Sequence, residues 1–206
     1  MFELLKKPAR FSLNKALQLK TKLAIKHLEN KPIILLEIGA GNKKGTKGWI
    51  TLDTARGADL QWDLRNGIPF PENSIDKIYT SHTFEHIPFP SLQILIRECH
   101  RTLKPQGSLS VCVPNARFYI DAYLNGKPFR GQSTFWQPGI CETGSTIDQL
   151  NYIAYMGGEH RYMFDEENLI KILRQNGFEQ AELRSFDSTI DLPERDHESI
   201  YATGIK

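Results

Sequence analysis

The chain contains the stretch IILLEIGAGN at residues 33–42, and this stretch decides how its neighbours are interpreted. Residues 33–38 form an apolar run that only Glu37 interrupts, which is typical of a strand buried on both faces of a parallel sheet. Gly39 and Gly41 follow directly. Glycines at such a bend let the backbone turn sharply and approach a ligand closely. The stretch therefore predicts a first strand that ends at a binding site.

Strands and helices are predicted to alternate after this stretch. The expected further strands lie at residues 49–53, 60–63, 75–80, 108–113, 178–184 and 199–205. The expected helices span residues 12–29, 91–103 and 165–176, with short ones near 115–124 and 146–155. This alternation indicates an α/β fold with a mostly parallel sheet. In such sheets, ligands bind beyond the carboxyl ends of the strands.

Two carboxylates end the second and third predicted strands. Asp53 closes residues 49–53, and a carboxylate there can accept hydrogen bonds from both ribose hydroxyls of an adenosine. Asp63 closes the neighbouring strand, where a carboxylate can accept from an adenine amino group. The sequence therefore predicts that the glycine bend and these two acids face one nucleoside.

These segments, taken in order, resemble the class I S-adenosylmethionine-dependent methyltransferases. The matching pieces are LLEIGAG at 35–41, Asp53, DL at 63–64, IPFPENSID at 68–76, FEH at 84–86, LKPQGSL at 103–109, and MFDEENL at 163–169 with its continuation to Gly177 and Phe178. The resemblance covers about residues 33–205. It implies a Rossmann-like, mostly parallel sheet of seven strands with an antiparallel last strand and helices on both faces.

The resemblance also implies S-adenosyl-L-methionine as the cofactor and a role for each matching residue. Glu37 would lie near the methionine amino group, Asp53 would hold the ribose and Asp63 the adenine. The other implied cofactor residues are Gly39, Ala40, Gly41 and Leu64, together with Ser81 and His82 beside the methionine end.

The first crossover departs from the family pattern. Only residues 42–48 separate Gly41 from Trp49, whereas a crossover with a helix needs at least ~10–12 residues. The helix is therefore predicted to be reduced to a turn. A dinucleotide needs a helix amino terminus for its pyrophosphate, whereas S-adenosylmethionine has no phosphate. The short crossover thus disfavours a nicotinamide oxidoreductase.

Residues 114–164 are predicted to be a substrate-side insertion within a single domain that spans residues 1–206. They carry ten of the chain's twenty-one aromatic residues. The substrate candidates are Tyr119, Trp136, Arg161 and Tyr162. The alternative is that these aromatic residues form the insertion's own small core.

Three histidines are candidates for a general base. A hydroxyl acceptor needs a base, and His82, His86 and His160 are predicted to lie near the cofactor. The alternative for each is a structural, hydrogen-bonded histidine. The three cysteines are far apart, so we expect neither a disulfide framework nor a metal site. Such cysteine usage favours a cytoplasmic location.

The opening segment is basic. Residues 1–31 hold eight Lys or Arg against two Glu, although the whole chain carries a net charge of only +2. We predict a basic helix that can contact an anionic membrane or a nucleic acid. The alternative is a solvated helix face.

Taken together, these patterns predict an enzyme that transfers a methyl group to a small molecule or to a glycan or cell-surface precursor. The alternatives are an RNA or protein methyltransferase and a non-catalytic S-adenosylmethionine-binding module. The last alternative would keep the same cofactor residues.

Overall fold

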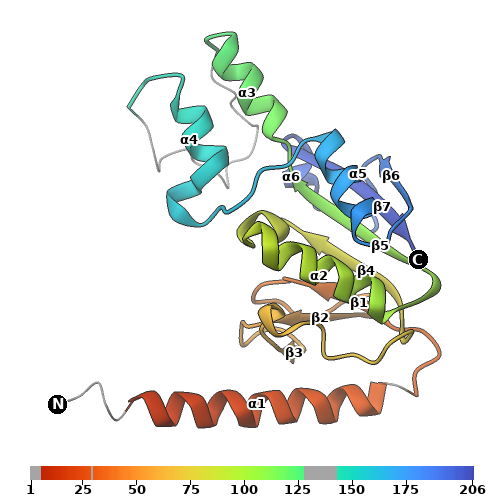
Figure 1. Ribbon diagram of the computed structural model, residues 1–206. Helices are drawn as coiled ribbons and strands as arrows, with labels where there is room; N and C mark the ends of the chain where they lie inside the picture. The colour runs from red at the N-terminus through yellow and green to blue at the C-terminus, as the bar shows by residue number, and fades with distance from the viewer. Residues whose placement is uncertain (1–5, 29, 128–142) are drawn as a thin grey trace.

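The structure, a computed structural model, describes residues 6–28, 30–127 and 143–206. Seven strands form one sheet in the order β3-β2-β1-β4-β5-β7-β6 (Figure 1). Their bounds are β1 (Leu35–Ile38), β2 (Trp49–Asp53), β3 (Leu60–Gln61), β4 (Ile75–Ser81), β5 (Leu103–Pro114), β6 (Gln180–Arg184) and β7 (Ser199–Ile205). Strands β1 to β5 pair in parallel, whereas β7 is antiparallel to β5 and β6. The predicted seven-stranded, mostly parallel sheet with an antiparallel last strand is confirmed.

Helices surround this sheet, also as predicted. They are α1 (Lys6–Leu28), α2 (Phe89–Thr102), α3 (Ala116–Leu124), α4 (Asp148–Tyr155), α5 (Glu166–Gln175) and α6 (Pro193–Asp196), with three short 3-10 helices η1 (Leu64–Asn66), η2 (Phe84–His86) and η3 (Met156–Gly158). α2 and α5 lie side by side on one face, where Arg97 Nη1 donates to Asn176 Oδ1 at 2.7 Å (Figure 1). Asp165 caps α5, since its side chain accepts from the backbone N–H of Asn168.

The main core lies between the sheet and α2 and α5. Leu92, Leu95, Ile96 and Cys99 recur on one stripe of α2 and are buried against the sheet. Each fully buried aliphatic side chain contributes about 1.5–3 kcal/mol relative to an exposed one. β1 lies between β2 and β4 within this core, so its carboxyl end is held rigidly.

The segment 185–198, which contains α6, packs on the opposite face of the sheet. Tyr79 Oη donates to Asp191 Oδ1 at 3.1 Å, and Arg184 pairs with the buried Asp191 at 2.5 and 2.8 Å. This ion pair compensates for the burial of the Asp191 carboxylate. The backbone N–H of Asn115, just after β5, donates to Glu198 O at 2.7 Å. This hydrogen bond places Glu198, the last residue of the segment, at the carboxyl end of β5.

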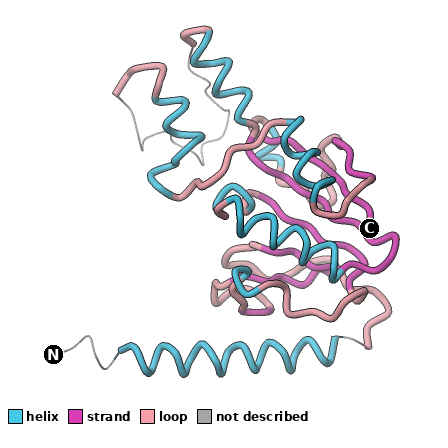
Figure 2. The backbone as a smooth tube through the Cα atoms, in the orientation of Figure 1, coloured by secondary structure: helices cyan, strands magenta, loops and turns pink. Residues whose placement is uncertain are grey.

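α3 and α4 stand apart from the sheet and form their own small core (Figures 1 and 2). Tyr119 and Tyr152 are buried there with ring centroids 5.4 Å apart, beside Ile153 and Met156. Tyr119 Oη donates to Glu198 Oε2 at 2.6 Å. The structure thus gives Tyr119, a predicted substrate residue, a packing and anchoring position.

The first crossover contains no helix among the described residues 39–48, as predicted. Side chains satisfy its backbone instead. Asp59 Oδ2 accepts from Gly45 N at 2.8 Å and from Thr51 N at 3.1 Å, and Asn42 Oδ1 accepts from Gly57 N at 2.7 Å. These hydrogen bonds satisfy the N–H of Gly45 and connect the crossover to β2 and to the connection before β3.

The bend after β1 depends on the absence of a side chain at Gly39. Gly39 has a φ of +69°, and a Cβ there would lie 2.2 Å from Thr83 Oγ1. Thr83 Oγ1 itself donates to Gly39 O at 3.2 Å. Gly41 has a similar φ of +67°, but a Cβ there would meet nothing within 4 Å.

We therefore predict different costs for Gly39→Ala and Gly41→Ala. Both substitutions place a side chain in the left-handed region, which costs roughly 1–2 kcal/mol. Gly39→Ala adds a steric conflict with Thr83, worth typically about 1–3 kcal/mol more. The free energy of unfolding in urea should show this order. Equal losses would mean that Thr83 does not constrain the bend.

Candidate active site

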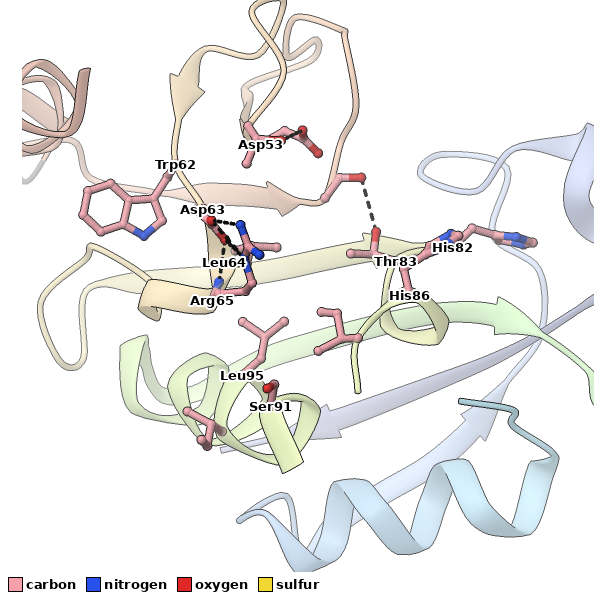
Figure 3. A pocket seen from close by; sticks show the side chains of 14 residues that line it. Asp53, Trp62, Asp63, Leu64, Arg65, His82, Thr83, His86, Ser91 and Leu95 are labelled. Atoms are coloured by element: carbon pink, nitrogen blue, oxygen red, sulfur yellow. Dashed lines mark hydrogen bonds and ion pairs between the residues drawn. The ribbon is translucent and has the colours of Figure 1, made fainter. Parts of the chain in front are cut away.

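A first cleft of about 300 Å³ opens at the carboxyl ends of β1, β2 and β4 (Figure 3). The structure brings Gly39, Asp53 and Asp63 together in its lining. They come from the bend after β1, the end of β2 and the residues just after β3. This edge of the sheet is where an α/β fold binds its ligand.

Asp53 joins the ends of two strands. Its Oδ2 accepts from Gly41 N at 2.9 Å, and its Oδ1 accepts from Ala55 N at 2.8 Å. A carboxylate has about four acceptor positions, so it retains capacity for ligand hydroxyls. Asp53 therefore both fixes the glycine bend and offers a charged acceptor to the cleft.

Asp63 is held by Arg65, a contact that the sequence analysis did not predict. Arg65 Nη2 lies 2.6 Å from Asp63 Oδ2, and Arg65 Nε donates to Oδ1 at 2.9 Å (Figure 3). The hydrogen bonds from Arg65 lower the pKa of Asp63, which stays ionised. Arg65 also lines the cleft beside Leu64.

The rest of the first cleft is largely apolar. Its wall includes Trp62, Leu64, Ile87, Ile94 and Leu95. Apolar walls with a few placed polar groups are the usual form of a small-molecule site. A flat base can pack on such a wall while its polar edges and the sugar reach the two acids, so the cleft suits a nucleoside.

Several predicted cofactor residues lie beside the cleft rather than in its lining. Ala40, Gly41 and Ser81 are not among the lining residues. Glu37 is not either, and its Oε1 pairs with Lys43 Nζ at 2.7 Å. Gly41 contributes through its hydrogen bond to Asp53.

A second cavity of about 190 Å³ adjoins the first cleft and shares His82 and His86 with it. Glu85, His160, Arg195 and Glu198 are among its other lining residues. The structure thus brings all three predicted base candidates together. It adds Arg195, which lies in α6, and Glu198, which follows α6; no local sequence signal connected them to the histidines, since both come more than thirty residues after His160.

Each of the three histidines makes one hydrogen bond through a ring nitrogen. His82 Nε2 bonds Ser199 Oγ at 2.9 Å, His86 Nδ1 bonds Glu159 O at 3.1 Å, and His160 Nδ1 bonds Ile153 O at 2.8 Å. Burial lowers the pKa of His82 well below its ordinary value and also lowers that of His160. His82 and His160 are therefore neutral at pH 7.

Glu85 is the most unusual group of the second cavity. Its side chain is 2% exposed, and neither carboxylate oxygen has a hydrogen-bond partner among the described residues. Its Oε1 lies 3.7 Å from His82 Nδ1 and 3.6 Å from His86 Nε2. Burial raises the pKa of Glu85 to about 8.

In the sequence, Glu85 was noted only as part of the segment FEH at 84–86 that resembles the methyltransferase family. The available signal was an acid beside apolar Phe84, directly after a buried strand. The backbone carbonyl of Glu85 also accepts from Arg161 N at 2.7 Å and Tyr162 N at 3.1 Å. These two bonds hold the neighbouring His160 against η2.

The described substrate candidates lie outside both cavities. Arg161 is exposed, and Tyr162 stacks on Phe89 with ring centroids 5.1 Å apart. Tyr119, as described above, lines neither cavity. Trp136 lies outside the described residues.

Known proteins share this architecture. A methyltransferase of Archaeoglobus fulgidus described as SAM-dependent is 15% identical, with coverage of 92% of this chain and 94% of that one and a TM-score of 0.53. A Thermotoga maritima SAM-dependent methyltransferase, described as a possible histamine N-methyltransferase, is 16% identical. The match covers 98% of this chain and 96% of that one, with a TM-score of 0.50.

A third similar structure is phosphoethanolamine N-methyltransferase 2 of Haemonchus contortus in complex with S-adenosyl-L-methionine. It is 14% identical, with coverage of 91% of this chain and 52% of that one and a TM-score of 0.51. At these identities the likeness is one of fold. A comparison with curated protein sequences finds no match.

A family comparison matches residues 10–183 to the family described as "Methyltransferase domain". This match includes the glycine bend, both acids of the first cleft, and the segment with Glu85 and His86. Together with the fold, it supports S-adenosylmethionine as the cofactor and methyl transfer as the activity. The chain therefore belongs to the methyltransferase-domain family.

Proposed function

We propose that the protein transfers a methyl group from S-adenosylmethionine in the first cleft to a small-molecule or glycan-precursor acceptor in the second cavity. The observation that carries this proposal is the wall formed by His82 and His86, which both spaces share. An acceptor in the second cavity would lie next to the end of the first cleft where the resemblance places the methionine.

The cofactor, when bound, supplies a methyl group on a sulfonium, and transfer of that methyl to the acceptor leaves S-adenosylhomocysteine. The protein's own contribution is mainly position. Holding two reacting atoms in line is worth up to about 7–11 kcal/mol in well-oriented models. Asp53 and Asp63 would fix the adenosine, and the lining of the second cavity would fix the acceptor.

The lining of the second cavity favours a polar, hydroxyl- or amine-bearing fragment. Glu159, Arg195 and Glu198 contribute charged groups, and the three histidines contribute ring nitrogens. Its volume of about 190 Å³ is below the ~300–1,000 Å³ of drug-sized pockets. These features support a small acceptor or one sugar unit of a precursor.

A proton leaves a hydroxyl acceptor as its oxygen takes the methyl group. We assign the proton acceptor to the histidine group of His86, His160 and His82. His86 has the best location of the three, because it lines both cavities and is the most exposed.

The polymer alternatives are less well supported. The basic helix α1 packs at β3, where Thr21 Oγ1 donates to Gln61 O at 2.8 Å. The second cavity borders α4 and η3, at the other side of the molecule (Figure 1). A nucleic acid or protein bound along α1 would therefore lie far from the proposed acceptor cavity.

We also propose that α1 contacts anionic lipid. Lys20 and Lys26 are exposed, Lys22 lies over the Trp62 ring at 5.8 Å from its centroid, and Leu19 and Leu23 are 60% and 54% exposed. Exposed leucines among lysines are typical of a helix that lies on a membrane surface. No helix of the described residues is long and apolar enough to cross a membrane.

The cofactor assignment predicts that S-adenosylhomocysteine binds and NAD does not. Asp53→Asn should weaken S-adenosylhomocysteine binding by about 1–3 kcal/mol, or roughly 5- to 150-fold, because the ribose hydroxyls lose a charged acceptor. Isothermal titration calorimetry measures this loss. Asp121→Asn is the control, since Asp121 is exposed on α3, lies outside the first cleft and removes the same charge. Equal affinities for Asp53→Asn and the wild type would remove Asp53 from the site.

The acceptor proposal is tested with S-adenosylmethionine labelled in its methyl group. We expect label in amino- or hydroxyl-bearing small molecules or sugar precursors. Label recovered in RNA or protein instead would select the polymer alternatives. Cofactor binding without transfer to any of these classes would select the non-catalytic module.

The lipid proposal predicts salt-sensitive binding to vesicles that contain phosphatidylserine and none to neutral vesicles. Substituting both Lys20 and Lys26 by Gln should weaken sedimentation with these vesicles about 10- to 30-fold, at about 1 kcal/mol per lysine. Substituting both Lys127 and Lys171 by Gln is the control with the same charge change. Binding to nucleic acid but not to vesicles would contradict the lipid proposal.

A further inference from the structure

Glu85, His86 and His160 converge at the junction of the two cavities. One ligand atom from each, a carboxylate oxygen or a ring nitrogen, lies within 4.8 Å of the other two. Glu85 and His86 belong to η2, and His160 is held beside them by the hydrogen bonds from Arg161 N and Tyr162 N to Glu85 O. The cluster is therefore fixed by the backbone as well as by packing.

The tautomers of the two histidines leave lone pairs at this cluster. A backbone carbonyl only accepts hydrogen bonds, so Nδ1 of His86 donates to Glu159 O and Nδ1 of His160 donates to Ile153 O. In each neutral ring Nε2 then carries the lone pair. His86 Nε2 lies 3.6 Å from Glu85 Oε1, which is also an acceptor when ionised.

His82 places another hydrogen-bond acceptor beside the carboxylate of Glu85. Ser199 Oγ donates to Arg195 O at 2.6 Å, so it accepts from His82 Nε2 and leaves the lone pair on His82 Nδ1. That nitrogen lies 3.7 Å from Glu85 Oε1. When Glu85 is ionised, its buried carboxylate thus faces ring nitrogens without a donor, an arrangement that a positive charge between them would stabilise.

The charges around the second cavity also favour a cation. Glu85, Glu159 and Glu198 line it with three carboxyl groups, against the guanidinium of Arg195. Tyr119 Oη donates to one oxygen of Glu198, whereas the carboxylate of Glu85 is buried and has no hydrogen-bond partner among the described residues.

We propose that Glu85, His86 and His160 bind one divalent first-row transition-metal cation, such as Zn²⁺. Two imidazoles and one carboxylate suit such metals, whereas Mg²⁺ and Ca²⁺ prefer oxygen ligands. Carbonyls that accept from Nδ1 of both histidines are the usual second layer around metal-binding histidines. Ligands about 2.1 Å from a tetrahedral ion lie about 3.4 Å apart, so no pair of ligand atoms in the cluster would have to approach by more than about 1.4 Å on binding.

The cation would have a specific consequence for the acceptor. Three protein ligands leave a coordination position open, as in catalytic metal sites. An acceptor oxygen in the second cavity can take that position and become more acidic. This consequence rests on the proposed function, whereas binding of the cation itself does not. In the cation-bound state His86 and His160 would act as ligands, and His82, whose Nδ1 carries a lone pair, would take the proton of the acceptor.

The cysteine spacings predicted no metal site. This cluster contains no cysteine, and His160 is 74 positions from His86, so only the fold brings its three members together.

The test uses the full chain, stripped with EDTA and titrated with Zn²⁺, Mn²⁺ or Mg²⁺ by calorimetry and thermal unfolding. We expect one Zn²⁺ per chain, and at least tenfold weaker binding by Glu85→Gln. Glu159→Gln is the matched control, since Glu159 lines the same cavity but contributes its backbone carbonyl. Without metal, Glu85→Gln should be at least as stable as the wild type, because its amide can donate to the ring nitrogens. With Zn²⁺, only the wild type and Glu159→Gln should gain in Tm.

His160→Gln is the second variant, in case Glu85→Gln fails to fold, and it should also lose at least tenfold in Zn²⁺ affinity. Absence of Zn²⁺ binding by the wild type, or equal binding by the wild type and both cluster variants, would overturn the proposal. S-adenosylhomocysteine is titrated into the same samples. If the wild type binds S-adenosylhomocysteine but no metal, the metal site alone is rejected. If the wild type does not bind S-adenosylhomocysteine, the proposed function is rejected.

Discussion

The short connection between β1 and β2 is the constraint on which the cofactor site depends. Seven residues between Gly41 and Trp49 cannot form a crossover helix, so side chains hold the two strand ends together. Asp53 bonds Gly41 N at 2.9 Å, and Asp59 bonds Gly45 N at 2.8 Å. The same carboxylate of Asp53 that fixes the glycine bend also faces the first cleft. In the proposed site, the shape of the glycine bend and the binding of a ligand are therefore coupled through Asp53.

The end of β4 connects this cleft to the second cavity. His82 adopts a left-handed φ of +48°, and the following residues turn at once into η2. This sharp turn places Thr83 against Gly39 and buries Glu85 on the far side. One short segment thus shapes the cofactor site, separates it from the second cavity and supplies the buried acid. A non-glycine residue in the left-handed region costs energy, and such strain is often found at functional sites.

The sequence was sufficient to predict the sheet, the reduced crossover and the positions of Asp53 and Asp63 at strand ends, because strand periodicity and turn residues are local signals. It was not sufficient for the second cavity. Arg195 and Glu198 reach it because β7 pairs antiparallel with β5, with Ser199 opposite Pro114, and that register is set by tertiary packing. The bidentate pairing of Arg65 with Asp63 likewise depends on side-chain rotamers that no periodicity reveals.

We propose that three neighbouring strand ends bind one adenosyl group, and a crystal structure of the protein with S-adenosylhomocysteine would examine this site atom by atom. We expect the ribose hydroxyls within hydrogen-bonding distance of Asp53, the base beside Asp63 and Leu64, and the sulfur next to His82. A nucleoside bound elsewhere, or an Asp53 carboxylate turned away from it, would rule the proposed site out.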